Sequence, residues 1–247
     1  MENISYKSLV FKTSVLKVLL VLICILYFLF LYIDIFNVRT SISSDNIKYI
    51  CIILCFIISL MTGKDSFNRR DVLLLQGGLF FTVLADLCLL IRDYFTLGVV
   101  FFSIVQILYS IRYEFTKVKL TLLRFIAISY IVIIVYLMVN FWIIEFDLLF
   151  AVVFFYLLCL ITSITRAIKA CKNNIYPSPN KYMIILAMLL FLLGDINVGL
   201  YNIARLINLS GELPTLLNNT SGLLIWIFYL PSQVLLSLSG YRFYSTR

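Results

Sequence analysis

Long apolar segments alternate with short polar ones along the chain. The apolar segments have the length and composition of membrane-spanning helices, which need about 20 residues. They predict eight spans, at residues 15–36, 48–62, 71–92, 95–112, 121–138, 140–164, 181–206 and 220–239. The connections are too short for a soluble domain. The sequence therefore predicts a single all-α, polytopic transmembrane domain over residues 1–247.

Two boundaries depend on weaker signals. The fifth and sixth spans are divided at Asn140, where YLMVNFW contains little turn chemistry. At the other boundary, three lysines lead into the apolar run Val18–Phe36, and no small-residue cleavage site follows it. We therefore expect the first segment to be a span and not a cleavable signal peptide.

The composition supports the membrane class and limits the chemistry. Hydrophobic residues make up 63% of the chain, charged residues 13%, and the mean hydropathy is +1.06, which is too apolar for a water-soluble domain. The chain has no histidine, which excludes Ser-His-Asp triads and histidine-ligated metals. Cys51 and Cys55 are four residues apart, but no second pair completes a metal site, and we expect neither a metal nor a cofactor.

The distribution of basic residues predicts the orientation. The net charge is +8, with 20 Lys and Arg residues. With a cytoplasmic N terminus, all of them fall on the cytoplasmic side except Arg39, Lys48, Arg92 and Arg205. Because Lys and Arg favour cytoplasmic loops, both termini are predicted to be cytoplasmic, in the cell membrane. The spread over many loops argues against a nucleic-acid partner.

Asp86 and Asp195 are the two acidic residues placed well inside predicted spans. Asp86 follows Asp71 by 15 residues, and Asp195 follows Lys181 by 14, in two spans of the same direction. At a rise of about 1.5 Å per residue, both lie about 21–23 Å from the start of their spans. A membrane-buried Asp costs about 2.5–3.5 kcal/mol, so two at one height indicate a functional site. Helix–helix hydrogen bonding and ion binding are the structural alternatives.

Polar residues accompany the aspartates at helical spacing. In the fourth predicted span they include Gln106 and Tyr109, and in the eighth Tyr229 and Gln233. Asn202 follows Asp195 by seven residues and so shares its helix face. These side chains predict a polar interior, although for any single tyrosine or serine interhelical packing is the favoured explanation.

Two segments suggest an internal repeat. FFSIVQILYS (Phe101–Ser110) and FYLPSQVLLS (Phe228–Ser237) share the pattern F-x-x-x-x-Q-[IV]-L-x-S. Each follows an Asp-bearing span, which predicts two parallel four-helix halves, 1–120 and 121–247. Pro231 occurs in the second segment alone.

Three segments resemble the lysoplasmalogenase (YhhN-like) family of membrane proteins. ADLCLLIRDYFTLGVVFFSIVQILY is similar to its first signature, LLFLLGDINVGL to its second aspartate segment, and IWIFYLPSQVLLSLSG to its closing segment. Two positions differ, since the family pattern has Gly where this chain has Ala85 and His where it has Gln106. Glutamine keeps hydrogen-bonding ability but cannot carry a proton near neutral pH.

The resemblance implies hydrolysis of the vinyl-ether bond of lysoplasmalogen, a lysophospholipid, to a fatty aldehyde and a glycerophospho-alcohol. Asp86 and Asp195 are then expected to be the acid and base. The implied substrate-binding residues are Gln106, Tyr109, Asn202, Tyr229, Gln233, Arg92 and Arg205; for the two arginines, snorkelling at helix ends is an equal alternative. A proton- or ion-coupled transporter and an inactive lipid-binding relative are the alternative functions. The oligomeric state is open.

Overall fold

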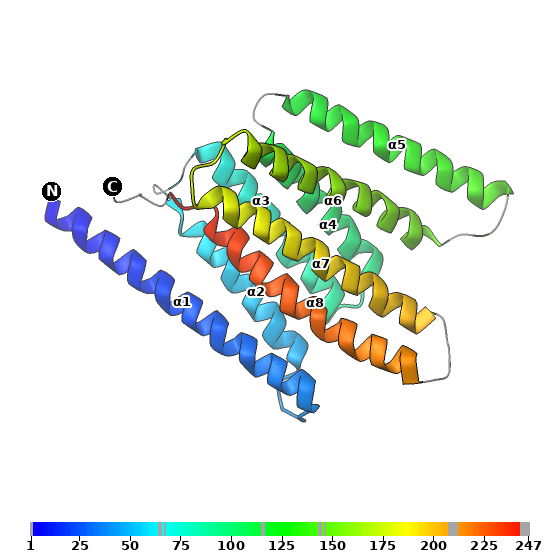
Figure 1. Ribbon diagram of the computed structural model, residues 1–247, viewed down its shortest axis with the longest axis horizontal. Helices are drawn as coiled ribbons and strands as arrows, with labels where there is room; N and C mark the ends of the chain where they lie inside the picture. Colours follow the sequence, from blue (N-terminus) through cyan, green and yellow to red (C-terminus); the bar gives the residue numbers. More distant parts are fainter. Residues whose placement is uncertain are drawn as a thin grey trace.

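The computed structural model describes residues 2–63, 66, 68–114, 117–142, 145, 147–206 and 212–242, and eight α-helices account for most of them (Figure 1). Their bounds are α1 Glu2–Phe36, α2 Ser44–Leu60, α3 Arg69–Asp86, α4 Phe95–Tyr113, α5 Val118–Trp142, α6 Leu148–Lys172, α7 Asn180–Leu206 and α8 Glu212–Leu238. A π-helical turn, Leu87–Ile91, extends α3. The all-α class predicted from the sequence is therefore confirmed.

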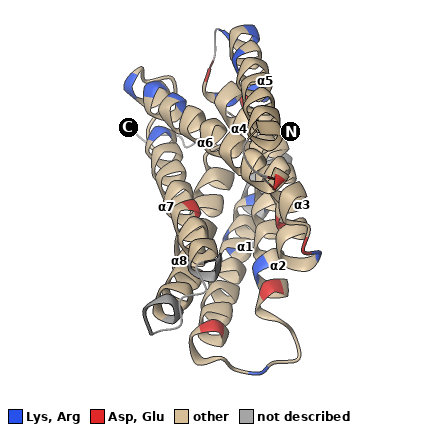
Figure 2. Ribbon diagram, turned by 90° about the vertical axis from the view of Figure 1, so that its right-hand side faces the viewer, with Lys and Arg blue, Asp and Glu red and all other residues tan. Residues whose placement is uncertain are grey.

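Most of the helices have the length and composition of membrane spans. Seven of the described helices are long and apolar enough to span it, while α2, with 17 residues, is shorter. Most of the length of each helix carries no charged residue in Figure 2. The chain is an integral membrane protein, and seven of its eight predicted spans meet the length of a full crossing.

The predicted break at Asn140 is wrong. Helix α5 continues through Asn140 to Trp142, and α6 begins at Leu148. The physical start signal is Asp147, whose side chain accepts a hydrogen bond from the Leu149 backbone N–H at 2.9 Å. Aspartate is a favoured N-cap, whereas a single asparagine in an apolar run does not stop a helix.

Six helices form a closed ring. In order around it, α2 packs on α3, α3 on α4, α4 on α6, α6 on α7, α7 on α8, and α8 returns to α2. Helices α1 and α5 lie outside the ring, at opposite edges of the molecule in Figure 1. Helix α1 contacts α2 and α8, and α5 contacts α6 and α4. Side chains from the six ring helices therefore share one interior.

A buried ion pair closes one end of the ring. We call this the basic end, where α3 and α7 begin and α4, α6 and α8 end. Arg112 donates to both carboxylate oxygens of Asp71, at 2.9 and 3.0 Å, and both side chains are almost fully buried. Tyr176 donates to Asp71 at 2.6 Å, and Arg112 also reaches the Ser239 hydroxyl at 3.0 Å. The network joins α3, α4, the α6–α7 connection and the end of α8.

Helix α1 is anchored through a proline. Pro231 lies inside α8 and has no N–H, so the carbonyl of Ile227, four residues earlier, loses its helical partner. The Tyr27 hydroxyl of α1 donates to this carbonyl at 3.4 Å. A polar contact thus holds a peripheral helix against the ring where α8 would otherwise leave an unpaired acceptor.

A glycine permits the close approach of α3 and α4. A Cβ added at Gly78 would overlap the ring of the buried Tyr109, with its Cζ at 2.8 Å. We expect Gly78→Ala to destabilise the protein by about 1–3 kcal/mol, because an overpacked core forces side chains off their rotamers. Gly199→Ala is the matched control, since nothing lies within 4 Å of its added Cβ. Thermal unfolding in detergent tests this, and equal midpoints for the two variants would contradict it.

Candidate functional site

Asp86 ends the regular part of α3. It is 3% exposed, and the next residues form the π-helical turn Leu87–Ile91, with the Arg92 N–H bonded to the Leu87 carbonyl at 3.2 Å. Such turns are rare and often occur at functional sites. The Tyr229 hydroxyl of α8 donates to the Asp86 carboxylate at 2.7 Å. This contact joins α3 to α8, two ring helices that also contact each other directly.

Asp195 has a tyrosine partner of its own. It lies on α7 and is partly buried. The hydroxyl of Tyr156, which is 8% exposed on α6, donates to one of its carboxylate oxygens. Each aspartate is therefore held by a phenol from a different helix, which stabilises a polar group in an apolar interior.

The two carboxylates lie at similar heights. Asp71 and Asn180 share one anchor at the basic end: Arg112 joins Asp71 to Ser239, and Asn180 donates to the Ser239 carbonyl at 2.9 Å. Asp86 follows Asp71 by 15 residues, and Asp195 follows Asn180 by 15. Both helices run away from this anchor, so each carboxylate is about 22 Å from it along its helix.

An aromatic cluster fills the space between the two Asp–Tyr pairs. The Phe102 ring of α4 has its centroid 6.2 Å from the rings of both Tyr156 and Tyr229. Phe191 of α7 contacts Phe102 at 6.0 Å and Tyr229 at 5.6 Å. The two pairs thus belong to one site in the ring interior, with apolar rings at its centre.

Two buried amides lie one helical turn closer to the basic end. Gln106 follows Phe102 by four residues on α4, and Gln233 follows Tyr229 by four on α8. Since α4 and α8 both run toward the basic end and touch at Phe102 and Tyr229, each glutamine lies on the same helix face as that contact, one turn nearer the basic end. Ser163 donates to Gln106 Oε1 at 2.5 Å.

These amides retain hydrogen-bonding capacity. Among the described residues, neither side-chain atom of Gln233 has a hydrogen-bond partner, and Gln106 Nε2 has none of normal geometry, although Gln106 lies beside Tyr156. Both glutamines are fully buried. Buried polar atoms of this kind are commonly satisfied by water or a ligand, so this layer can hold polar molecules.

The remaining predicted residues have different surroundings. Tyr109 is buried between α3 and α4, against Gly78. Asn202 donates to the Val198 carbonyl of its own helix at 2.8 Å, and Arg92 is exposed at the end of the π-helical turn. The side chain of Arg205 lies outside the residues whose side chains the structure describes. Of the predicted set, the structure gathers Asp86, Asp195, Tyr229, Gln106 and Gln233.

Tyr156 and Ser163 were not predicted from the sequence. Tyr156 donates a hydrogen bond to Asp195, and Ser163 donates one to Gln106. Tyr156 and Ser163 are seven residues apart, with Cys159 between them and Arg166 after them, so they share one face of the helix. The same spacing identified the polar stripes in the fourth and eighth spans. The same rule applied to the sixth span would have identified them.

Two carboxyl groups at one height, in an apolar surrounding and near amides that can hold water, form an arrangement suited to paired acid–base chemistry. One oxygen of each carboxyl group is fixed in direction by its tyrosine hydroxyl. Among the described residues, no third His, Cys, Asp or Glu joins them to make a metal-binding group.

Comparison with known proteins relates the chain to a protein family. The model of the YhhN family matches residues 44–240, which contain the whole ring and both aspartates and begin after α1. No curated protein matches the chain, and no solved structure matches it.

Proposed function

Since the chain belongs to the YhhN family, we propose that it is a lysoplasmalogenase-like hydrolase, which cleaves the vinyl-ether bond of a lysoplasmalogen. The observation that carries this proposal is the pair of carboxyl groups, Asp86 and Asp195, at similar height on either side of one aromatic cluster. The products are a fatty aldehyde and a glycerophospho-alcohol.

The proposed reaction needs one acid and one base. A protonated carboxyl group donates its proton to the vinyl carbon remote from the ether oxygen, which leaves an oxocarbenium ion. The second carboxylate takes a proton from a water molecule. The oxygen of that water attacks the positively charged carbon of the oxocarbenium ion and gives a hemiacetal. Collapse of the hemiacetal breaks the carbon–oxygen bond and returns a proton to the alcohol, so one water is consumed for each bond broken.

The surroundings of the aspartates suit these roles. An apolar site favours a neutral carboxylic acid that can donate a proton. The flat, electron-rich faces of Phe102 and Tyr229 stabilise a developing positive charge, as aromatic rings do for other cations. Gln106, through its Nε2, and Gln233, through both atoms of its amide, would hold the attacking water one turn away from Phe102 and Tyr229.

The test is turnover by the purified protein in detergent or vesicles. We expect the fatty aldehyde and the glycerophospho-alcohol to form in equal amounts from a lysoplasmalogen. A lysophospholipid with the same headgroup and an ester in place of the vinyl ether is expected to remain intact. Proton-coupled solute uptake by vesicles that form no aldehyde would contradict the proposal and favour a transporter.

Tyr229→Phe is expected to slow turnover about ten- to hundredfold without preventing folding. The change removes the hydroxyl that orients Asp86, and hydrogen bonds to charged groups contribute about 1.5–3 kcal/mol. Tyr27→Phe is the control, because it also removes a tyrosine hydroxyl that donates to α8, but to the backbone carbonyl of Ile227 and not to an aspartate. Unchanged aldehyde formation by Tyr229→Phe would remove this tyrosine from the mechanism.

A further inference from the structure

A continuous groove runs between α5 and α6, outside the ring. Its part near the basic end has a volume of about 340 Å³, and its second part has about 440 Å³. On α5 the lining residues of the two parts are adjacent in sequence, Ile131 and Val132. On the antiparallel α6 the nearest lining residues of the two parts, Thr162 and Leu157, are five residues apart. Between Thr121 and Val139 the groove is about 27 Å long, close to the thickness of a bilayer core.

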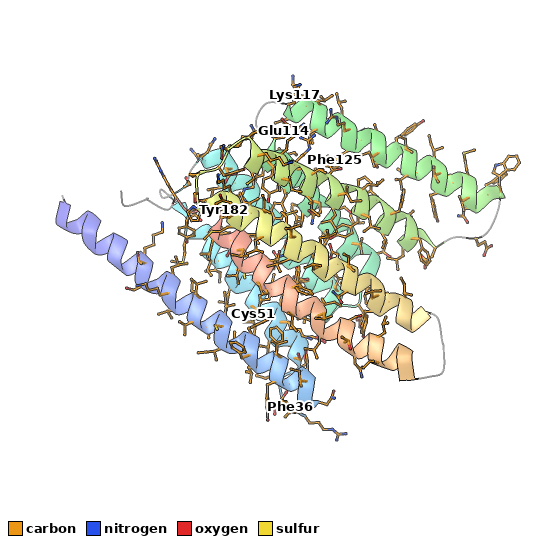
Figure 3. The ribbon with its side chains drawn as sticks, in the orientation of Figure 1. Phe36, Cys51, Glu114, Lys117, Phe125 and Tyr182 are labelled. Carbon is orange, nitrogen blue, oxygen red and sulfur yellow. The ribbon has the colours of Figure 1, made fainter. Side chains whose placement is uncertain are left out.

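The two parts differ in chemistry. The second is lined by apolar side chains and one tyrosine, among them Val135, Ala151 and Phe154. The part near the basic end contains Arg124 and Arg166. Figure 3 shows Phe125 between α5 and the ring, with Glu114 close by. One end of the groove is therefore cationic and the rest is a hydrocarbon-like track.

The arginines are available to an anion. Arg166 donates through one terminal nitrogen to Glu114 and keeps its other donors. Arg124 is exposed and has no ion pair among the described residues. The hydroxyls of Thr121 and Thr162 already donate to carbonyls of their own helices, at 3.1 and 2.7 Å. Two guanidinium groups against one carboxylate leave a net positive charge at this end.

We infer that this groove binds a membrane phospholipid, with its phosphate between Arg124 and Arg166 and an acyl chain along the apolar part of α5 and α6. Guanidinium groups suit phosphate oxygens, which accept paired N–H donors. The charge at one end and the apolar track beyond it match the two ends of such a lipid.

This lipid is not the hydrolysed substrate. Glu114, the partner of Arg166, lies two residues after Arg112, at the basic end of the ring. Asp86 and Asp195 are about 22 Å from that end along their helices. In a lysoplasmalogen only a few bonds separate the phosphate from the vinyl ether, so one molecule cannot occupy both positions. The groove is a second lipid site, and its existence does not depend on the proposed hydrolysis.

The experiment is a binding titration of the detergent-purified full chain with chain-labelled phosphatidic acid, which has no vinyl ether. We expect Arg124→Gln to weaken binding about tenfold or more, as for the loss of a charge-assisted contact. Lys172→Gln is the matched control, a basic residue of the last α6 turn that does not line the groove. Labelled diacylglycerol is expected to bind more weakly than phosphatidic acid, and to bind Arg124→Gln and Lys172→Gln equally.

Further variants keep the result interpretable. Arg166→Gln leaves Glu114 without this ion pair and can disturb folding, so Arg124→Gln carries the argument. Val135→Trp replaces an exposed side chain of the apolar part with a larger one that fills the groove. It is expected to weaken the binding of both phosphatidic acid and diacylglycerol. Asp86→Asn is expected to bind phosphatidic acid as the wild type does, which separates this site from hydrolysis. Equal binding by wild type and Arg124→Gln, or equal weakening by Lys172→Gln, would overturn the inference.

Discussion

Asp86→Asn and Asp195→Asn are each expected to lower aldehyde release from lysoplasmalogen by about 10²–10⁴-fold, the contribution typical of a positioned acid or base. Asparagine keeps the size of the side chain and can still accept a hydrogen bond from Tyr229 or Tyr156. It cannot donate a proton to carbon or remove one from water. The measurement is the initial rate of aldehyde formation by purified protein at equal concentrations.

Asp34→Asn is the control for loss of a carboxylate near the end of a span. Asp34 pairs with Lys48 at 3.0 Å, and Lys48 keeps a second partner in Asp45 at 3.0 Å, so the change leaves no unpaired ammonium. We expect normal turnover and a normal elution volume in size-exclusion chromatography. Wild-type rates for either Asp86→Asn or Asp195→Asn would rule out the two-carboxylate mechanism.

Asp71→Asn is expected to be the most destabilising single substitution considered. It leaves the guanidinium of Arg112, which is 1% exposed, without its counter-charge. Removing one partner of a buried ion pair costs about 3–5 kcal/mol, which in a chain of this size lowers the unfolding midpoint by roughly 10 °C. Thermal unfolding in detergent, followed by intrinsic fluorescence, measures the shift.

Two comparisons separate this effect from a general loss of stability. In the double variant Asp71→Asn/Arg112→Met no unpaired charge remains, so we expect it to unfold at a higher temperature than Asp71→Asn alone. Lys181→Gln changes a half-buried side chain bonded to Asn174 and should leave the midpoint nearly unchanged. A double variant as unstable as the single one would show that the unpaired charge is not the cause.

The sequence predicts the helices and the two aspartates because both signals are local. An apolar segment must cover its own backbone hydrogen bonds in lipid, so hydropathy finds the helices. Asp86 and Asp195 are conspicuous because apolar residues flank them on both sides. The helical period then places Gln106 and Gln233 on faces that the structure brings together.

The partners of these residues depend on which helices are neighbours, and hydropathy does not encode that order. Tyr156 donates a hydrogen bond to Asp195 only because α6 packs on α7. Asp71 and Arg112 look like ordinary charges at span ends, where long side chains reach water. Their burial follows from ring closure, which brings the end of α8 against α3 and α4.

The ring also sets an order for biosynthesis. The hydroxyl that binds Asp86 belongs to Tyr229, 143 residues further along, and Tyr241, which donates to the Ile58 carbonyl, is 183 residues from its acceptor. While the ribosome is still making α4 to α7, the nascent chain carries a membrane carboxyl group without this tyrosine and an α2 without α8 beside it. Insertion of the last helix supplies both, so a chain truncated before α8 would expose a polar seam to lipid and present a target for membrane quality-control proteases.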